Sequence, residues 1–320
     1  MPSSNEATRM AGFAALAILA AGAAPALAQE QTDPISDLPP PMAKSSSVEE
    51  DARTAEGIRR QRVRDTPSKL SGDHLIVAVG TGYTPDYVGS DDYKVRFGGA
   101  FRGSYKGVGF ASKGLGLSLD LVPELDGDIG FSFGPTVRYR ANRSGSVKDP
   151  VVDLLPDLPK TVEAGIDAGI SFSDILTSYD NLSIGGEIRW DVSGKGAGRI
   201  IDTSINYVTA LGPGTGAAIS VGMDFVNDDY ADFYYTVDAA GSAATSGALP
   251  VYLGEGGTKN RTARLYFARD FDNNFRNGGW GAVVSGGYTQ LRGSAAETPI
   301  TALRGDRDQF SALAAVGYLF

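Results

Sequence analysis

The chain of 320 residues carries a net charge of −9 and contains no cysteine. A duplex-binding protein needs a basic face to displace counterions, so this acidic balance argues against nucleic acid as a partner. A chain without cysteine has no disulfides, no thiolate catalysis, no cysteine-ligated zinc and no lipoprotein anchor.

The first residues, 1–28, have the layout of a signal peptide. Arg9 precedes an apolar run from Met10 to Ala24, and Ala26-Leu27-Ala28 provides the small residues of a cleavage site. An uncleaved anchor is the alternative, but the run is short for a membrane span. We expect export, cleavage after Ala28 and a mature chain that begins at Gln29.

The next segment, Gln29–Asp73, has a different composition from the rest of the chain. It contains Pro39-Pro40-Pro41, Ser45-Ser46-Ser47 and mixed charge, with few large apolar residues. Such a segment cannot bury a core, and we expect a disordered periplasmic leader. A helix over Val48–Val63 that forms on a partner is one reading of its charges, and a solvated leader is the simpler one.

From His74 to Phe320, apolar and polar residues alternate with period two, as in strands with two different faces. In Thr161–Ser173, for example, Val162 and Ile166 lie on one face and Glu163 and Asp167 on the other. These strands run for about ten residues or more, whereas strands of soluble proteins average about five or six. The pattern predicts an all-β fold, a closed antiparallel transmembrane β-barrel over residues 74–320.

The strand count follows from requiring both barrel ends in the periplasm. If Tyr105–Asp120 holds two strands the barrel has twelve, and if it is one bent strand ten is the better number. Short turns then face the periplasm, and the long segments Asn142–Lys160, Asp228–Asn260 and Gly293–Asp308 face outward, as expected for such barrels. The other predicted strands are Leu75–Tyr83, Val95–Gly103, Ile129–Ala141, Thr161–Ser173, Leu182–Val192, Arg199–Leu211, Gly216–Val226, Arg261–Phe271, Trp280–Leu291 and Gln309–Phe320.

The last strand ends on Phe320, with Tyr318 two residues earlier. A soluble domain has no need to end on an exposed phenylalanine. We interpret Tyr318 and Phe320 as the signal that the barrel assembly machinery reads. The barrel itself would contact outer-membrane lipid and lipopolysaccharide in a Gram-negative cell.

Seven charged residues fall on the face predicted to line the lumen. Their carboxylates are candidates for acid–base work. Arginines of the same face lie at a similar depth, however, so we favour a neutralising network that fills the lumen. The seven residues are Arg138, Arg140, Glu163, Asp167, Glu187, Arg189 and Asp191.

Other sites with chemical potential carry weak signals. The single histidine, His74, has no evident serine partner for a catalytic triad. The acidic pairs Asp91-Asp92 and Asp228-Asp229 lack a full calcium-ligand spacing. We therefore expect no enzyme activity, no cofactor and no metal site.

Several stretches resemble the MltA-interacting protein family, also called MipA/OmpV. The opening Tyr83–Tyr93, with its Tyr-Val-Gly-Ser-Asp-Asp-Tyr, is similar to that family's first signature, and Ser242–Tyr252 with Gly254–Gly257 is similar to its large central loop. Similarity continues in Thr298-Pro299-Ile300 and in the terminal Gly317–Phe320, and covers nearly everything after His74.

The resemblance implies an outer-membrane barrel that acts as a scaffold between a lytic transglycosylase and a murein synthase. A narrow pore for solutes or antibiotics and a surface adhesin are the alternatives. Whether side chains fill the lumen distinguishes a pore from the other two functions.

Overall fold

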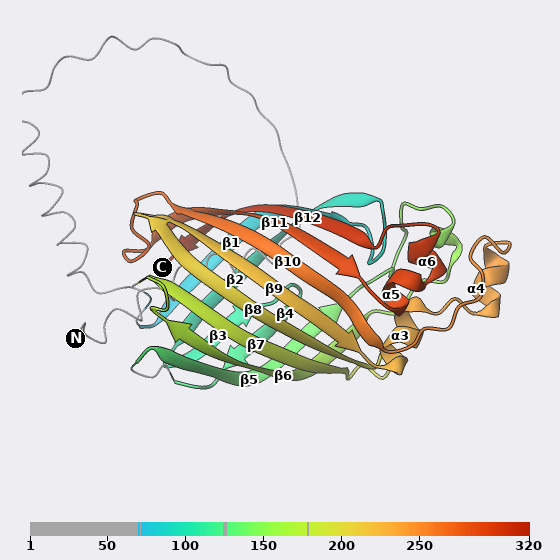
Figure 1. The fold of residues 1–320 in the computed structure, drawn as a ribbon, viewed down its shortest axis with the longest axis horizontal. Coiled ribbons are helices and arrows are strands. Elements are labelled where there is room, and N and C mark those ends of the chain that lie inside the picture. The colour runs from blue at the N-terminus through green and yellow to red at the C-terminus, as the bar shows by residue number, and fades with distance from the viewer. Residues whose placement is uncertain (1–69, 71, 124–126, 178) are drawn as a thin grey trace, which may run out of the picture.

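The computed structural model describes residue 70 and residues 72–123, 127–177 and 179–320. Twelve antiparallel strands close into one barrel, in which β1 pairs with both β2 and β12 (Figure 1). This confirms the predicted all-β barrel and the count of twelve, since Tyr105–Asp120 holds two short strands. The strands are β1 (His74–Pro85), β2 (Tyr93–Tyr105), β3 (Val108–Ser112), β4 (Gly116–Asp120), β5 (Ile129–Arg140), β6 (Thr161–Ser173), β7 (Asp180–Asp191), β8 (Arg199–Gly212), β9 (Thr215–Val226), β10 (Gly257–Asp270), β11 (Gly279–Leu291) and β12 (Asp308–Leu319).

The period-two pattern becomes the two faces of the wall. On β5, Phe131, Phe133 and Val137 are exposed on the outside, while Gly134 and Thr136 are buried inside. Apolar side chains exposed in this way are expected where strands face lipid. The sequence pattern therefore orients each strand as well as predicting it.

The largest difference from the predicted strands is at the start of β10, at Gly257 instead of Arg261. The register of β10 against β9 shifts between Thr258 and Asn260. Because a bulge places an extra residue in one strand, Lys259 and Asn260 are both buried. Two consecutive inward polar residues break the alternation of polar and apolar positions. The strand predicted from that alternation therefore begins four residues too late.

The two ends of the barrel differ as expected. The turns at the end where β1 begins and β12 ends are short, and include residues 106–107, 174–179 and 213–214. The opposite end carries the long segments 141–160, 227–256 and 292–307. We name these ends periplasmic and extracellular.

The extracellular segments contain helices that the alternation pattern does not reveal: α3 (Asp228–Tyr235), α4 (Ala239–Ala244), α5 (Ser294–Glu297), α6 (Pro299–Ala302) and the short 3-10 helix η4 (Val152–Leu154). In the ranges that the structure describes, no helix is both long and apolar enough to cross a membrane.

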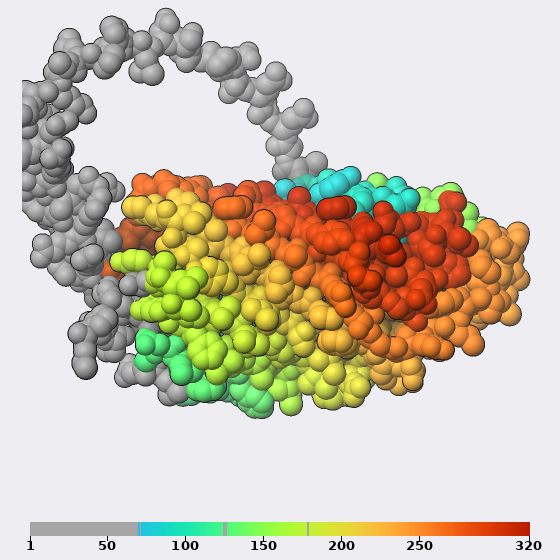
Figure 2. Space-filling view, viewed as in Figure 1, coloured from blue at the N-terminus to red at the C-terminus, as the bar shows by residue number. Residues whose placement is uncertain are grey.

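The extracellular segments pack into a cap with its own apolar contacts. One cluster joins α3 to Ile200, Leu291 and Ala295, and another joins Tyr87 and Val152 to neighbouring loops. Figure 2 shows the orange and red parts of the cap packed together over one end of the barrel. The long loops therefore form a folded unit.

The predicted signal peptide and most of the leader lie outside the described residues. Of the leader, Leu70 is 1% exposed and belongs to an apolar cluster with Ile76, Val208 and Tyr266 on inner positions of the wall. Asp73 accepts a hydrogen bond from the backbone N–H of Lys106, in the turn between β2 and β3. The end of the leader therefore contacts the periplasmic half of the barrel.

Candidate functional site

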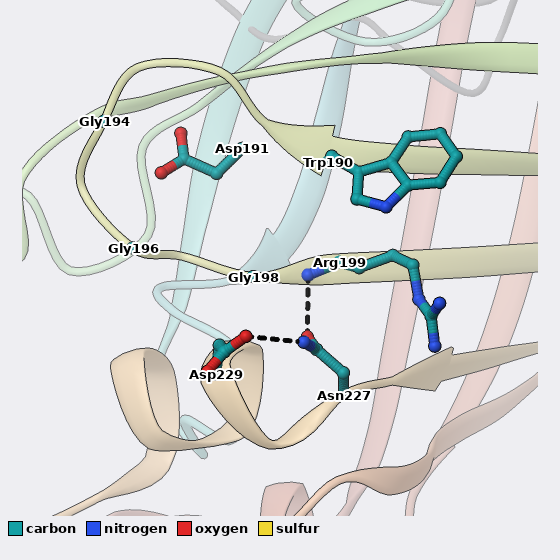
Figure 3. A pocket seen from close by; sticks show the side chains of 8 residues that line it. All are labelled: Trp190, Asp191, Gly194, Gly196, Gly198, Arg199, Asn227 and Asp229. Atoms are coloured by element: carbon teal, nitrogen blue, oxygen red, sulfur yellow. Dashed lines mark hydrogen bonds between the residues drawn. The ribbon is translucent and has the colours of Figure 1, made fainter.

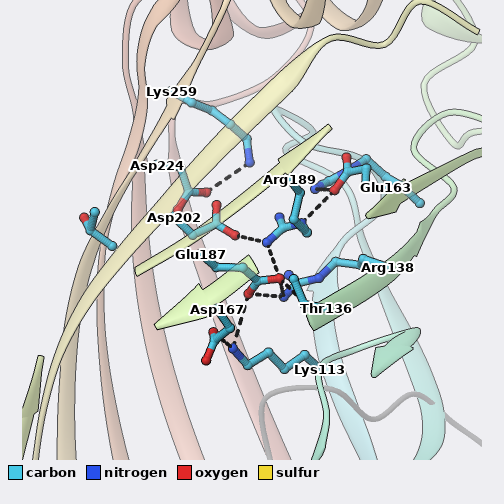
Figure 4. Close-up of polar contacts among 12 residues, drawn as sticks. Lys113, Thr136, Arg138, Glu163, Asp167, Glu187, Arg189, Asp202, Asp224 and Lys259 are labelled. Carbon is cyan, nitrogen blue, oxygen red and sulfur yellow. Dashed lines mark hydrogen bonds and ion pairs between the residues drawn. The ribbon is translucent and has the colours of Figure 1, made fainter. Parts of the chain in front are cut away.

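Charged side chains from seven strands or their ends meet on the inner face of the wall (Figure 4). We call these residues the lumen network. It contains five cationic and five anionic side chains, so its formal charges cancel. The cations are Lys113, Arg138, Arg140, Arg189 and Lys259, and the anions are Glu163, Asp167, Glu187, Asp202 and Asp224.

Arg189 of β7 is the centre of the network and is 0% exposed. Its Nε donates to Oε2 of Glu163 over 2.9 Å. Its Nη1 lies 2.7 Å from Oε1 of Glu187 and 2.6 Å from Oδ2 of Asp202. One buried guanidinium thus compensates carboxylates from three successive strands, β6, β7 and β8.

Glu187 joins the centre to the side of the barrel formed by β3 and β5. Arg138 Nη2 lies 3.1 Å from its Oε2, and Thr136 Oγ1 donates to its Oε1 over 2.8 Å. Lys113, just after β3, contacts both Glu187 and Asp167. A carboxylate with this many partners is held in one position.

Glu163 is bound from its other side by Arg140 of β5. Arg140 Nε donates to Oε1 over 2.5 Å, and Nη2 donates to Oε2 over 3.0 Å. This two-point pairing fixes the plane of the carboxylate. Glu163 is therefore held between two arginines and has no free oxygen for proton transfer.

The bulge in β10 places Lys259 and Asn260 in a second set of contacts beside Arg189. Lys259 Nζ and Asn260 Nδ2 both donate to Oδ2 of Asp224, over 3.1 and 2.7 Å. Asp224 pairs in register with Asp202 across β8 and β9. The cations Arg189 and Lys259 thus flank two adjacent carboxylates.

Helix α3 covers the extracellular side of the network. The Tyr230 ring lies 5.7 Å from the Arg140 guanidinium and 5.9 Å from the Lys259 ammonium, within cation–π range. The Tyr234 hydroxyl lies 3.1 Å from Thr161 Oγ1. Burial, and then the neighbouring Tyr230, raise the pKa of Tyr234, so it stays a neutral hydroxyl. The cap and the network are thus one packed unit.

The structure brings six of the seven residues predicted from the sequence into one set of ion pairs. Asp191 pairs in register with Glu163 but has no ion pair within the described residues. The Asp191 carboxylate accepts backbone N–H groups of Ser193, Lys195 and Ala197 over 2.8, 2.9 and 3.1 Å. It therefore shapes the loop between β7 and β8. Asp191 is the last residue of β7, so its side chain can reach the loop. The alternation of polar and apolar residues cannot distinguish such a carboxylate from one that points into the lumen.

Sequence reasoning missed four members of the lumen network and the neutral Thr136, which donates a hydrogen bond to it. Asp202 and Asp224 lie on the polar faces of β8 and β9 and could have been found from their pairing. Lys113 lies beyond the end of a strand and Thr136 is uncharged, so neither has such a signal. Lys259 is hidden by the bulge described above.

The other candidate sites serve local structure. His74 Nδ1 lies 2.9 Å from the Gly72 carbonyl. Asp228 accepts a hydrogen bond from Gly256 N, and Asp229 accepts one from Asn227 Nδ2. Across the described part of the chain, no group of three or more His, Cys, Asp and Glu side chains is placed to hold a metal ion.

The two residues interpreted as an assembly signal lie at the periplasmic end. Phe320 is 58% exposed, and its ring centroid lies 4.7 Å from that of Tyr318. Tyr318 also contacts Trp280 of β11 at 5.2 Å. The three rings form an aromatic edge on the outer face of β11 and β12.

The family model described as MltA-interacting protein MipA matches residues 77–320, which is nearly the whole barrel. No curated protein matches the chain significantly. Among solved structures, the chain is similar to the NanC porin, with 11% identity over 76% of this chain and 98% of that chain, at a TM-score of 0.45. It is also similar to an outer membrane channel from Pseudomonas putida F1, with 13% identity over 80% of this chain and 98% of that chain, at a TM-score of 0.43. For OprB of Pseudomonas putida the identity is 10% over 83% and 97% of the two chains, at a TM-score of 0.41.

Proposed function

The chain belongs to the MltA-interacting protein MipA family, and we propose that it is an outer-membrane scaffold for murein-processing enzymes and not itself an enzyme. The partners are a periplasmic lytic transglycosylase, which the family description suggests, and a murein synthase. The proposal needs a barrel that works by binding proteins at its periplasmic side.

The observation that carries the proposal is the packing around Arg189. Rings of charged side chains along a water-filled wall set the selectivity of many conducting pores. The lumen network instead pairs five cations with five anions, and its central guanidinium has no exposed surface. This arrangement favours a barrel that acts through its outer surfaces over one that acts through its lumen.

The ion pairs of the two most buried carboxylates in the network support the non-enzymatic part of the proposal. Glu163 and Glu187, the most buried carboxylates of the network, each bind two or more cations. A general acid or base needs a pKa near the working pH and access to substrate. Carboxylates fixed between arginines offer neither.

The periplasmic turns are short, so a partner has little surface to grip there. We place the predicted leader, Gln29–Asp73, in the periplasm, where it would offer a longer segment, and Val48–Val63 within it carries charges of both signs. We propose that the enzymes contact this leader together with the short periplasmic turns of the barrel. A segment that folds on its partner can bury a large area with few residues.

A surface adhesin is the second candidate, and one observation favours it. The extracellular segments form a cap with two apolar clusters, so they present a fixed surface outside the cell. Binding of this cap to a host or neighbouring surface would not involve the periplasmic enzymes. The two candidates thus use opposite ends of the barrel.

The scaffold proposal is tested with the purified full-length chain in detergent, a purified lytic transglycosylase and a purified murein synthase. We expect a ternary complex on size exclusion, because a scaffold must hold both enzymes at once. Binding of neither enzyme would reject the scaffold. Step-like conductance of the same preparation in planar bilayers would support the pore instead.

A further inference from the structure

An open cavity of about 670 Å³ lies at the extracellular rim, between the loop that joins β7 to β8 and the start of α3 (Figure 3). Trp190, Arg199 and Asn227 are among the residues that line it. It lies apart from the lumen network, because Trp190 and Arg199 are exposed on the outer face of the wall. The proposed function makes no use of this cavity.

The cavity is at the height where lipid headgroups meet the barrel. Trp190 is 42% exposed and belongs to a set of outward aromatic side chains near the extracellular ends of the strands. Aromatic girdles mark the membrane–water interfaces of outer-membrane barrels. The other members are Tyr83, Tyr139, Tyr288 and Phe310.

Arg199 is the cation of this cavity and pairs in register with Trp190. Its backbone N–H donates to Asn227 Oδ1 over 2.7 Å, but its guanidinium has no hydrogen bond or ion pair within the described ranges. Arg261, also exposed on the outer face two strands away, has none there either. The arginines of the lumen network, in contrast, are all paired.

Figure 3 shows how the groups are divided. The side chains of Trp190 and Arg199 extend to one side of the cavity, and Asp191 and Asp229 lie on the other. Both carboxylates are held by local hydrogen bonds, Asp191 by its loop and Asp229 by Asn227. Each oxygen of Asp191 already accepts two hydrogen bonds from its loop. The cavity thus has a cation beside an aromatic ring on one side and a fixed acceptor, Asp229, on the other.

The side chains that line this cavity fit one chemical class of ligand. A guanidinium binds a phosphate through paired N–H donors. An indole ring offers an apolar surface to the face of a sugar ring. A fixed carboxylate such as that of Asp229 accepts a hydrogen bond from a sugar hydroxyl. A phosphorylated saccharide presents all three features, and a plain phospholipid headgroup lacks the sugar.

We propose that Trp190, Arg199 and the loop after β7 bind the phosphorylated saccharide headgroup of a glycolipid in the outer leaflet. The lipid-facing position of both side chains selects a membrane lipid over a soluble sugar phosphate. Arg261 provides a second cation along the same face of the wall. Such a site would anchor the cap to the membrane surface.

The chain offers an internal reporter, since it has two tryptophans and the other, Trp280, lies at the periplasmic end. In a Trp280→Phe background, Trp190 emission is followed while diphosphorylated lipid A is added in detergent. We expect a saturable change. Arg199→Ala should weaken binding about tenfold, the effect of losing one charge-assisted contact, and removal of the lipid phosphates should do the same.

Arg269→Ala is the control, because Arg269 is exposed on the same face of β10 at the periplasmic rim. It should bind lipid A like the parent. Equal affinities of the parent and of Arg199→Ala, with normal heat-modifiable migration of both, would overturn the proposal. So would equal affinity for lipid A without phosphate, which would reduce the site to a general aromatic girdle. Equal affinity for soluble glucosamine 1-phosphate would overturn its assignment to a lipid.

Discussion

Arg189 and Glu163 face each other across β7 and β6, with the Nε of the arginine 2.9 Å from Oε2 of the glutamate and both side chains buried. Burying either charge without the other would lower the free energy of unfolding by several kcal/mol, because the charge would be unpaired and away from water. Substitution of either residue therefore tests how tightly the lumen is packed.

Glu163→Gln should destabilise the barrel by about 3 kcal/mol or more, because Arg140 and Arg189 lose a charged partner. Unfolding in urea, followed by tryptophan fluorescence in lipid vesicles, measures the change. Ser146→Ala in an exposed extracellular loop is the control and should leave the midpoint unchanged. Equal midpoints for the two variants would mean that the lumen is wide and hydrated, and the pore function would gain support.

Arg189→Met should be more damaging than Glu163→Gln. It leaves Glu163, Glu187 and Asp202 without the guanidinium that lies between them. Arg261→Met, which removes an exposed arginine with no ion pair in the described structure, is the matched control. We expect little folded Arg189→Met protein on heat-modifiability gels and a normal amount of Arg261→Met. Similar amounts of both would remove the central role given to Arg189.

The cap should depend on pH through Asp149, which lies in the loop after β5. Burial opposes its ionisation, but hydrogen bonds from Arg304 and from the backbone N–H groups of Val152 and Val151 outweigh this effect and lower its pKa. A lowered pKa gives stability that is present above the ordinary value of an aspartate, about 3.9, and that is lost as the pH falls through the folded value.

Cleavage of the cap by pepsin between about pH 5 and about pH 2 tests this. We expect slow cleavage near the upper limit and a rise only below the ordinary pKa of aspartate. Asp149→Asn should be cleaved faster at the upper limit and should lose most of the pH dependence. A parent cap with the same susceptibility throughout would contradict the assigned role of Asp149.

Deletion of Phe320 should lower the amount of folded barrel in cells more than it lowers the stability of the purified barrel. Phe320 is one exposed lipid-facing ring at the periplasmic end, next to Tyr318. Phe310→Ala removes a ring from the same strand at its extracellular end and is the control. Unchanged levels of heat-modifiable protein after the deletion would reject the assembly signal.

The sequence predicted the barrel because alternation is a local property that each strand carries by itself. The inner position of Glu163 follows from period two, and the direction of the loops follows from the short turns. The strand number also required both barrel ends in the periplasm, and it left ten strands as an alternative to the twelve observed. The helices of the cap could not be predicted this way. Their Tyr230 and Tyr234 are buried by contacts with distant strands, which no local pattern encodes.

The lumen network was predictable in part for the same reason. Arg138, Glu187 and Arg189 lie on regular strands, where each side chain's face can be counted. Lys259 could not be placed because the bulge at Thr258 to Asn260 changes the count by one. Asp191 pairs in register with Glu163, as its predicted inward position requires, but its carboxylate binds backbone N–H groups of its own loop, a contact that strand alternation does not encode.

Deleting Thr32 to Pro67 tests the central claim, that this barrel binds murein-processing enzymes through its periplasmic side. Intact cells that express the tagged full-length or shortened chain are crosslinked, the barrel is captured, and the yield of crosslinked lytic transglycosylase is measured by mass spectrometry. We predict a clear yield for the full-length chain and its loss on deletion, with heat-modifiable barrel present in equal amounts. No lytic transglycosylase on the full-length chain would contradict the claim.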